Sequence, residues 1–325
     1  MKRLMKLCLA VGVAVGAASL AFGPAQAQKG QIVYIVDTMG DPFWGYVAKG
    51  IKDAVEQRGY ALAISDSKSS AQNQLQNAQD AVAKHVTGIV LSPTDSSTAP
   101  AVLDLAEKAN IPVAFAGIGT VSGKYVTYVT SDDEQGAHGA GEELAKALKA
   151  KGWTDGAVGM VQISQARQNG KLRTGGFVKA MDESGHKVVA RNEMRLYTAD
   201  ETFKFTQDML TAHPELRGIF VEAANASNGA LRAIQAGRRS DDTLLVAFDG
   251  LPEFVDLIKK GDLVGAAMQQ PYLMGAKAAD AVMDSLEGKP TQQTIALPIL
   301  IVTKANMDEM LPVLKKTVFP GGSLQ

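Results

Sequence analysis

Short apolar runs rich in valine and isoleucine alternate with amphipathic stretches of helical length along most of this chain. Examples are residues 32–36, 88–91 and 244–248, each of which has the length of a buried strand. Parallel strands that are covered by helices on both faces are continuously apolar in this way. The alternation therefore predicts an α/β protein with βαβ units wound around parallel sheets.

The pattern forms two series. The first has strands at residues 32–36, 61–65, 88–91, 113–116 and 126–130, and helices at 43–58, 71–85 and 98–109. The second has strands at residues 156–163, 187–192, 218–222, 244–248 and 264–268, and helices at 135–151, 171–184, 201–212, 225–236 and 252–260. Gly59 and Asn110 are suited to end two of the helices of the first series.

A helix at residues 276–286 and an apolar run at 294–302 remain, and we expect them to complete the first sheet. The chain would then form two doubly wound, Rossmann-like lobes. Their expected limits are residues 28–131 plus 270–301 for the first lobe, and 132–269 plus 302–325 for the second. The chain would cross between the lobes near residues 131–133, 269–271 and 301–303, and three such crossings make a hinge.

The first 27 residues have the pattern of a secretory signal peptide. Three basic residues precede an apolar run at residues 7–22, and Ala25-Gln26-Ala27 supplies small residues for cleavage. The apolar run is short for a membrane span, and Pro24 follows it directly. We expect export to the periplasm with cleavage near Ala27.

Composition excludes several classes of function. The single cysteine, Cys8, lies in the leader, so disulfides and thiolate chemistry are not expected in the exported chain. Loss of the three basic residues of the leader changes the net charge from −1 to −4, which leaves no basic excess to attract nucleic acid. The histidines at 85, 138, 186 and 213 have no metal-ligand spacing, and the chain contains neither a nucleophile elbow nor a Walker or dinucleotide loop. We expect no catalytic residues, metal or cofactor. The alternative from a different class of function is an exported α/β enzyme.

The stretch Asp41-Pro42-Phe43-Trp44 follows the first expected strand. Asp41 is a good helix N-cap and Pro42 suits the first helical position. Ligands of open α/β sheets bind outside the carboxyl ends of the strands, which is where this stretch would lie. The two aromatic residues are therefore candidates for a ligand cleft, and the alternative is that both pack into the core.

Two charged residues are further candidates. Asp249 follows the strand at residues 244–248, where a carboxylate can accept hydrogen bonds from ligand hydroxyls or cap the next helix. Arg173 lies early in the helix at residues 171–184. Its fork of donors can hold two neighbouring oxygens, although a solvated surface arginine is the ordinary case.

With these residues the chain resembles the periplasmic sugar-binding proteins of ABC transporters, the group that includes ribose-binding protein. The resemblance covers essentially the whole exported sequence. It rests on an ordered set of segments, namely Asp41-Pro42-Phe43-Trp44, Ala109-Asn110-Ile111-Pro112-Val113, Leu210-Thr211-Ala212-His213-Pro214-Glu215-Leu216, Asn228-Gly229-Ala230-Leu231-Arg232-Ala233 and Val246-Ala247-Phe248-Asp249-Gly250. A single motif would be weak evidence, whereas this ordered set is specific.

The resemblance implies a type I periplasmic binding protein, whose two lobes close around one small ligand. The ligand would be a sugar, a polyol or a related molecule, and an ABC transporter permease in the inner membrane would receive the closed form. No cofactor is implied, no nucleic-acid partner is expected, and we expect a monomer. A periplasmic sensor module that presents its ligand to a membrane receptor is the alternative. A sugar-responsive repressor shares this fold, but the leader occupies the place of a DNA-binding headpiece.

The resemblance also implies a role for each ligand-binding position. Aromatic stacking falls to Phe43 and Trp44, and Tyr197 would add a further wall unless it only marks a helix entry. Polar contacts would come from both lobes and the hinge. The full set of expected ligand-binding residues is Asp41, Phe43, Trp44, Gly117, Arg173, Tyr197, Asn225, Asp249 and Gln269.

Two pairs of residues depart from the family pattern. Gly117-Ile118 stands where an acidic residue and an arginine are usual, and Ala223-Ala224 stands where an Asn-Asp pair is usual. A buried hydroxyl without a partner costs about 1–3 kcal/mol, so the loss of these anchors would weaken the binding of an ordinary sugar. Either Glu222, Asn225 or Gln168 replaces them, or the ligand carries fewer hydroxyl groups or an apolar portion.

Overall fold

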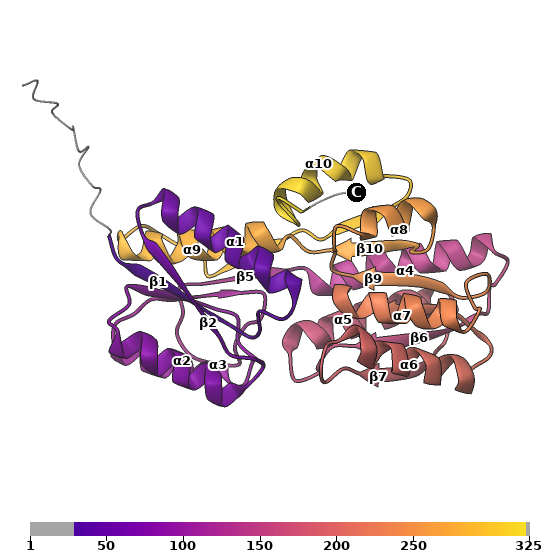
Figure 1. Ribbon diagram of the computed structural model, residues 1–325, viewed down its shortest axis with the longest axis horizontal. Coiled ribbons are helices and arrows are strands. Elements are labelled where there is room, and N and C mark those ends of the chain that lie inside the picture. The colour runs from indigo at the N-terminus through magenta and orange to yellow at the C-terminus, as the bar shows by residue number, and fades with distance from the viewer. Residues whose placement is uncertain (1–28, 323–325) are drawn as a thin grey trace, which may run out of the picture.

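The computed structural model describes residues 29–322 and arranges them in two α/β lobes, each built on a six-stranded sheet (Figure 1). The expected signal peptide lies outside the described residues. The strands of the first sheet, in spatial order, are β11 (Thr294–Leu297), β5 (Thr127–Ser131), β4 (Val113–Ala116), β3 (Gly88–Leu91), β1 (Gln31–Val36) and β2 (Ala61–Asp66). All neighbouring pairs in it are parallel. Its helices are α1 (Pro42–Gln57), α2 (Ala71–Ala83), α3 (Ala99–Lys108) and α9 (Pro271–Leu286).

The second sheet belongs to the second lobe. Its strands, in spatial order, are β12 (Leu300–Thr303), β10 (Gly265–Met268), β9 (Leu244–Phe248), β8 (Leu216–Val221), β6 (Ala157–Gln162) and β7 (Val188–Glu193). Only β12 runs antiparallel to its neighbour within this sheet. The helices are α4 (Asp133–Ala150), α5 (Gln168–Glu183), α6 (Ala199–Ala212), α7 (Ala224–Ala236), α8 (Phe254–Lys260) and α10 (Met307–Thr317).

The predicted fold class is confirmed, and three expectations about elements need correction. The run at residues 294–302 is not one strand, because it divides at Pro298 and Ile299 into β11 of the first sheet and β12 of the second. Helix α9 begins at Pro271, five residues before the expected start, since proline fits a first helical turn. Helix α5 begins at Gln168 rather than at Lys171, which brings three further residues onto a helix beside the cleft.

Strand β1 shows how a continuous apolar run is buried. Ile32, Tyr34 and Val36 pack with α1 and α9 on one face of the sheet. Val33 and Ile35 pack with α2 and α3 on the other face, and Figure 1 shows these two helix layers above and below the sheet. Because both faces are covered, every side chain of the strand after Gln31 is buried and the sequence has no polar alternation.

Two glycines fix how α1 packs against α9. A Cβ added to Gly50 would lie 1.9 Å from the carbonyl oxygen of Tyr272, and one added to Gly275 would lie 2.1 Å from that of Val47. The two helix backbones can approach this closely only because neither glycine has a side chain. This contact holds the first turn of α1, with its aromatic residues, at the carboxyl end of β1.

The chain passes between the two sheets between β5 and α4, between β10 and α9, and between β11 and β12. Asp132, Gln269-Gln270 and Pro298-Ile299 lie in these connections. The third crossing therefore lies at residues 298–299 rather than at the expected 301–303, because β12 already belongs to the second sheet. The three segments run side by side between the lobes in Figure 1. Within residues 29–322, none of the helices has the length and apolar character that a membrane span requires.

Candidate functional site

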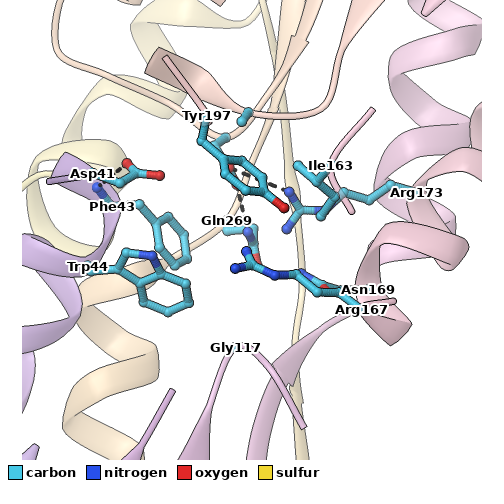
Figure 2. A pocket seen from close by; sticks show the side chains of 12 residues that line it. Asp41, Phe43, Trp44, Gly117, Ile163, Arg167, Asn169, Arg173, Tyr197 and Gln269 are labelled. Atoms are coloured by element: carbon cyan, nitrogen blue, oxygen red, sulfur yellow. Dashed lines mark hydrogen bonds and ion pairs between the residues drawn. The ribbon is translucent and has the colours of Figure 1, made fainter. Parts of the chain in front are cut away.

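A small cavity lies between the lobes, lined by residues at the carboxyl ends of their strands (Figure 2). We call its two sides the first-lobe wall and the second-lobe wall. The first-lobe wall consists of Asp41, Phe43, Trp44 and Gly117. The second-lobe wall consists of Ile163, Arg167, Asn169, Arg173, Tyr197, Ala223 and Asp249, and Gln269 lies in the crossing segment between them.

The first turn of α1 presents the aromatic side chains of the first-lobe wall. Asp41 is the N-cap, and its Oδ1 accepts a hydrogen bond from the Phe43 amide at 3.0 Å, while Pro42 takes the first helical position. The rings of Phe43 and Trp44 meet edge to face, with centroids 4.8 Å apart. Both line the cavity, and Trp44 also packs into the core of the first lobe, so it combines the two roles that the sequence left open.

The departure at Gly117-Ile118 has a structural reason. Gly117 has a φ of +81°, and a Cβ built on it would lie 3.3 Å from two carbons of the Trp44 indole ring. The indole therefore takes the space where a side chain at position 117 would begin. Ile118 is buried in the same core cluster as Trp44. An apolar surface thus lies where the resemblance implied a charged pair.

Arg173 lies at the base of the second-lobe wall and is not a solvated surface arginine. Its Nε donates to Oδ1 of Asp133 at 2.8 Å, and its Nη1 donates to the carbonyl oxygen of Glu222 at 2.8 Å. Nη1 also lies 3.5 Å from Oδ2 of Asp249, and the guanidinium lies 3.9 Å from the centroid of the Phe248 ring. Only 3% of the residue is exposed, so the group is held rigidly with part of its donor fork toward the cavity.

Asp249 and Gln269 form a second pair beside this arginine. Nε2 of Gln269 donates to Oδ1 of Asp249 at 2.6 Å, and both residues are buried. Asp249 does not cap the following helix, because α8 begins at Phe254 after Glu253. Burial raises the pKa of the Asp249 carboxyl, and the charge of Arg173 opposes that shift. The pair therefore offers both acceptors and donors to a ligand.

The three residues expected to replace missing anchors lie elsewhere. Glu222 is fully buried, and its carboxyl oxygens accept from the Ile163 amide at 2.9 Å and from the Thr174 hydroxyl at 2.8 Å. Burial raises its pKa to about 8. Gln168 is exposed in the first turn of α5. Asn225 lines a neighbouring cavity rather than the one between the two walls.

The sequence analysis missed Arg167 and Asn169, which flank Gln168. Arg167 is the N-cap residue of α5, and Asn169 is the second residue of that helix. Among residues 29–322, Oδ1 of Asn169 has no hydrogen-bond partner, although the side chain is buried at the cavity. The signal that could have found them is the polar run after strand β6, in the position that ligand-binding loops take in this fold.

Tyr197 lies just before α6 and has a φ of +56°. Its hydroxyl accepts a hydrogen bond from the Ser164 amide at 3.0 Å, and its ring lies 4.9 Å from the guanidinium carbon of Arg167. Tyr197 thus both precedes a helix and forms part of the second-lobe wall. It supports Arg167 on one side of the cavity.

Charges of both signs surround the cavity. Burial raises the pKa of Asp41 to about 6, with smaller contributions from Asp249 and Asp37. Burial also raises the pKa of Asp133 to about 6, against the charge of Arg173. The described part of the chain holds no cluster of three histidine, cysteine or acidic side chains arranged to bind a metal.

Comparisons with known proteins agree with this geometry. A family model described as a periplasmic binding protein domain matches residues 32–290. The ribose import binding protein of Escherichia coli is 28% identical over 304 residues, which cover 94% of this chain and 99% of that protein. The D-apiose import binding protein of Paraburkholderia graminis is 26% identical, over 92% of this chain and 96% of that protein.

The fold is similar to that of a carbohydrate transporter solute-binding protein from Agrobacterium radiobacter in complex with D-arabinose. The TM-score is 0.82 at 25% identity, and the match covers 89% of this chain and 98% of that one. These relatives are binding proteins rather than enzymes. The family model extends over most of the chain and includes strands of both sheets. The chain therefore belongs to the periplasmic binding protein family.

Proposed function

We propose that this protein binds a small sugar or polyol between its two lobes in the periplasm and delivers it to the permease of an ABC transporter. The observation that carries the proposal is the cavity itself, in which aromatic rings on the first-lobe wall face buried polar groups on the second-lobe wall (Figure 2). Aromatic faces suit the C–H surface of a sugar, and the opposite wall suits its hydroxyl groups.

The electrostatics disfavour an anionic ligand. Arg173 already lies between two carboxylates, Asp133 and Asp249, and Arg167 is paired with Asp37, so neither arginine is free to balance a further negative charge. An anionic ligand would therefore add an unbalanced charge to a buried site, which is costly. Hydroxyl groups can instead accept from the remaining guanidinium and amide hydrogens and donate to Asp41, Asp249 and the free Oδ1 of Asn169. Each hydrogen bond to a charged group contributes about 1.5–3 kcal/mol, and a few of them approach the −8 kcal/mol of micromolar binding.

The relatives support the same ligand class. Two of them are named for the import of ribose and of D-apiose, and the solute-binding protein from Agrobacterium radiobacter is in complex with D-arabinose. A solute-binding protein from Agrobacterium vitis with bound D-fucose is 26% identical, with a TM-score of 0.79 over 89% of this chain and all of that one. We infer that the ligand-binding residues are Asp41, Phe43, Trp44, Gly117, Arg173, Tyr197, Asp249 and Gln269, together with Arg167 and Asn169, while Asn225 contributes from the neighbouring cavity.

The same proposal includes export and domain movement. The leader pattern supports cleavage near Ala27, which N-terminal sequencing of the secreted protein tests. Residues 29–131 and 270–298 would move as one lobe, and residues 132–269 and 299–322 as the other, about the three crossings. The closed form would be the monomer that the permease receives.

The test is a calorimetric titration of the exported protein with D-ribose, D-apiose, D-arabinose, D-fucose and glycerol. We expect at least one to bind with about micromolar affinity, and Phe43→Ala and Asn169→Ala each to weaken it at least tenfold. Arg195→Ala, at an exposed position of the second lobe, should leave the affinity unchanged. The proposal fails if none of these compounds, and no other neutral sugar or polyol, binds. Loss of uptake of the bound compound on deletion of the gene then separates transport from sensing.

A further inference from the structure

Arg167 belongs to the second lobe, but its guanidinium is bound by the first. Its Nη2 donates to Oδ2 of Asp37 at 2.6 Å, and its Nε donates to the carbonyl oxygen of Thr94 at 3.0 Å. Asp37 follows β1 and Thr94 lies shortly after β3, so both are at the carboxyl edge of the first sheet. We propose that Arg167 is a positioning residue that joins the lobes through the protein's own atoms and thereby favours the closed arrangement in the absence of ligand.

The contact is built as a buried ion pair rather than a surface one. Arg167 is 7% exposed and Asp37 is 2% exposed. Exposed ion pairs contribute little because water screens them, whereas short charge-assisted hydrogen bonds in a buried site are among the strong polar contacts in proteins. Nε and Nη2 donate to two different groups of the first lobe, which fixes the orientation of the planar guanidinium.

Tyr197 orients the side chain of Arg167 for this contact. Its ring lies 4.9 Å from the guanidinium carbon of Arg167, and its hydroxyl is held by the Ser164 amide of the same lobe. These contacts do not cross the cleft, so they persist when the lobes separate. The cation–π contact keeps the arginine over the ring, pointing toward the first lobe. Closure then costs little side-chain entropy at this position.

The hinge gives the pair its conformational effect. Opening separates Arg167 from Asp37 and Thr94, and both ions then regain water. The pair therefore stabilises only the closed arrangement, and its strength helps to set the ratio of closed to open molecules. A protein that is partly closed before binding spends less of the ligand's binding energy on closure. This last consequence rests on the proposed function. The contact of Arg167 with Asp37 and Thr94, which we call the latch, does not.

Asp37 allows the latch to be separated from ligand contact. Arg167 lines the cavity between the walls, so its replacement would also remove a potential ligand contact. Asp37 lines the neighbouring cavity and not the one between the walls, and its carboxylate holds Arg167. Asp37→Asn has nearly the same shape and removes the charge that holds the arginine. An effect shared by Asp37→Asn and Arg167→Met therefore belongs to the pair.

The test measures the distance between the lobes with no sugar present. Residues 28–325 contain no cysteine, so Lys84→Cys and Lys204→Cys, at exposed positions of the turn after α2 and of α6 respectively, can carry a fluorophore pair. We expect Arg167→Met and Asp37→Asn each to lower the ratio of closed to open molecules at least about threefold. The double variant should go no further than either single one, and Arg195→Met should match the unsubstituted protein.

Unchanged distance distributions in both single variants would overturn the latch. Effects that add fully in the double variant would also overturn it, because the two side chains would then act independently. Circular dichroism of each variant confirms that it is folded. Because no sugar is used, a failure to bind any sugar would count against the proposed function and leave this measurement intact.

Discussion

The two walls of the cleft are built on different principles. The first-lobe wall works by shape, since the Trp44 indole, the Phe43 ring and the absent side chain of Gly117 fit against one another. The second-lobe wall works by charge, since Arg173 and Arg167 are buried and held by carboxylates. The first wall can therefore change by repacking, whereas each charge of the second depends on a partner that must also be present.

The sequence departs from the pattern that the resemblance implies on both walls, at Gly117 on the first and at Ala223 on the second. The indole of Trp44 lies against Gly117, so the first-lobe wall stays closely packed. Arg173 and Asp249 of the second-lobe wall and Gln269 of the crossing segment retain the expected residue types and form one connected network. The comparison predicts that substitutions in this network lower the free energy of unfolding more than substitutions in the first-lobe wall do. The following variants test that order.

The largest effect is expected from Arg173→Met. The substitution leaves Asp133 and Asp249 buried without their cation, and breaking a buried pair in this way costs about 3–5 kcal/mol. The free energy of unfolding, measured by urea denaturation without ligand, should fall by that amount. Arg232→Met is the matched control, because its pair with Asp200 is exposed and should contribute less than about 1 kcal/mol. Similar losses for the two variants would show that the second-lobe wall does not depend on charge pairing.

A smaller effect is expected from Gly117→Ala on the other wall. An alanine at a φ of +81° costs about 1–2 kcal/mol in the backbone, and its Cβ would also press on the Trp44 indole at 3.3 Å. Gly152→Ala measures the backbone cost alone, because the φ of Gly152 is +78° and nothing lies within 4 Å of the added Cβ. The free energy of unfolding, measured by urea denaturation, should fall more for Gly117→Ala than for Gly152→Ala, and the difference is the cost of the contact with the indole. Equal losses at both positions would mean that the indole does not restrict this wall.

Arg167→Met tests the residue that joins the walls. Unlike Asp133 and Asp249, Asp37 can regain water when the lobes separate, so its charge is not trapped. We expect the free energy of unfolding to fall by only about 1 kcal/mol or less, even though Arg167 is nearly as buried as Arg173. Urea denaturation of both variants under the same conditions makes the comparison. A loss as large as that of Arg173→Met would indicate that the two lobes cannot separate at this contact.

Much of the fold could be predicted from the sequence because the parallel strands are covered on both faces. Continuous apolar runs marked β3, β4 and β9 to the residue. The division of residues 294–302 was missed, since β11 and β12 are both apolar and only their partners differ. Periodicity carries no information on which sheet a strand joins.

The site was predictable where a strand end or a helix start marked it, as for Asp41 and Asp249. Arg167 was missed because its role depends on Asp37 and Thr94, which are 130 and 73 residues away along the chain. Glu222 was one of three residues expected to replace the missing anchors, but its carboxyl group bonds within its own lobe. The hydrogen-bond partners of these two side chains depend on distances in the folded structure, which the local sequence does not encode.

The smallest effect concerns the carboxylate of the first-lobe wall. Burial raises the pKa of Asp41 from 3.8 to about 6, so between these values the folded state binds more protons than the unfolded state. The free energy of unfolding therefore falls as pH rises from about 4 to about 6, and the full penalty is present above that range.

Asn is an equally good N-cap, so Asp41→Asn should keep α1 intact and remove this penalty. Because Asp41 is only partly covered, the gain at pH 7 relative to pH 4 should be less than about 1 kcal/mol. Urea denaturation of both proteins at pH 4, 5, 6 and 7 measures it, and the difference between them removes the contribution of Asp133, which titrates in the same range. A difference that does not change with pH would place the charge of Asp41 in water, and the first-lobe wall would then be less closed than its geometry indicates.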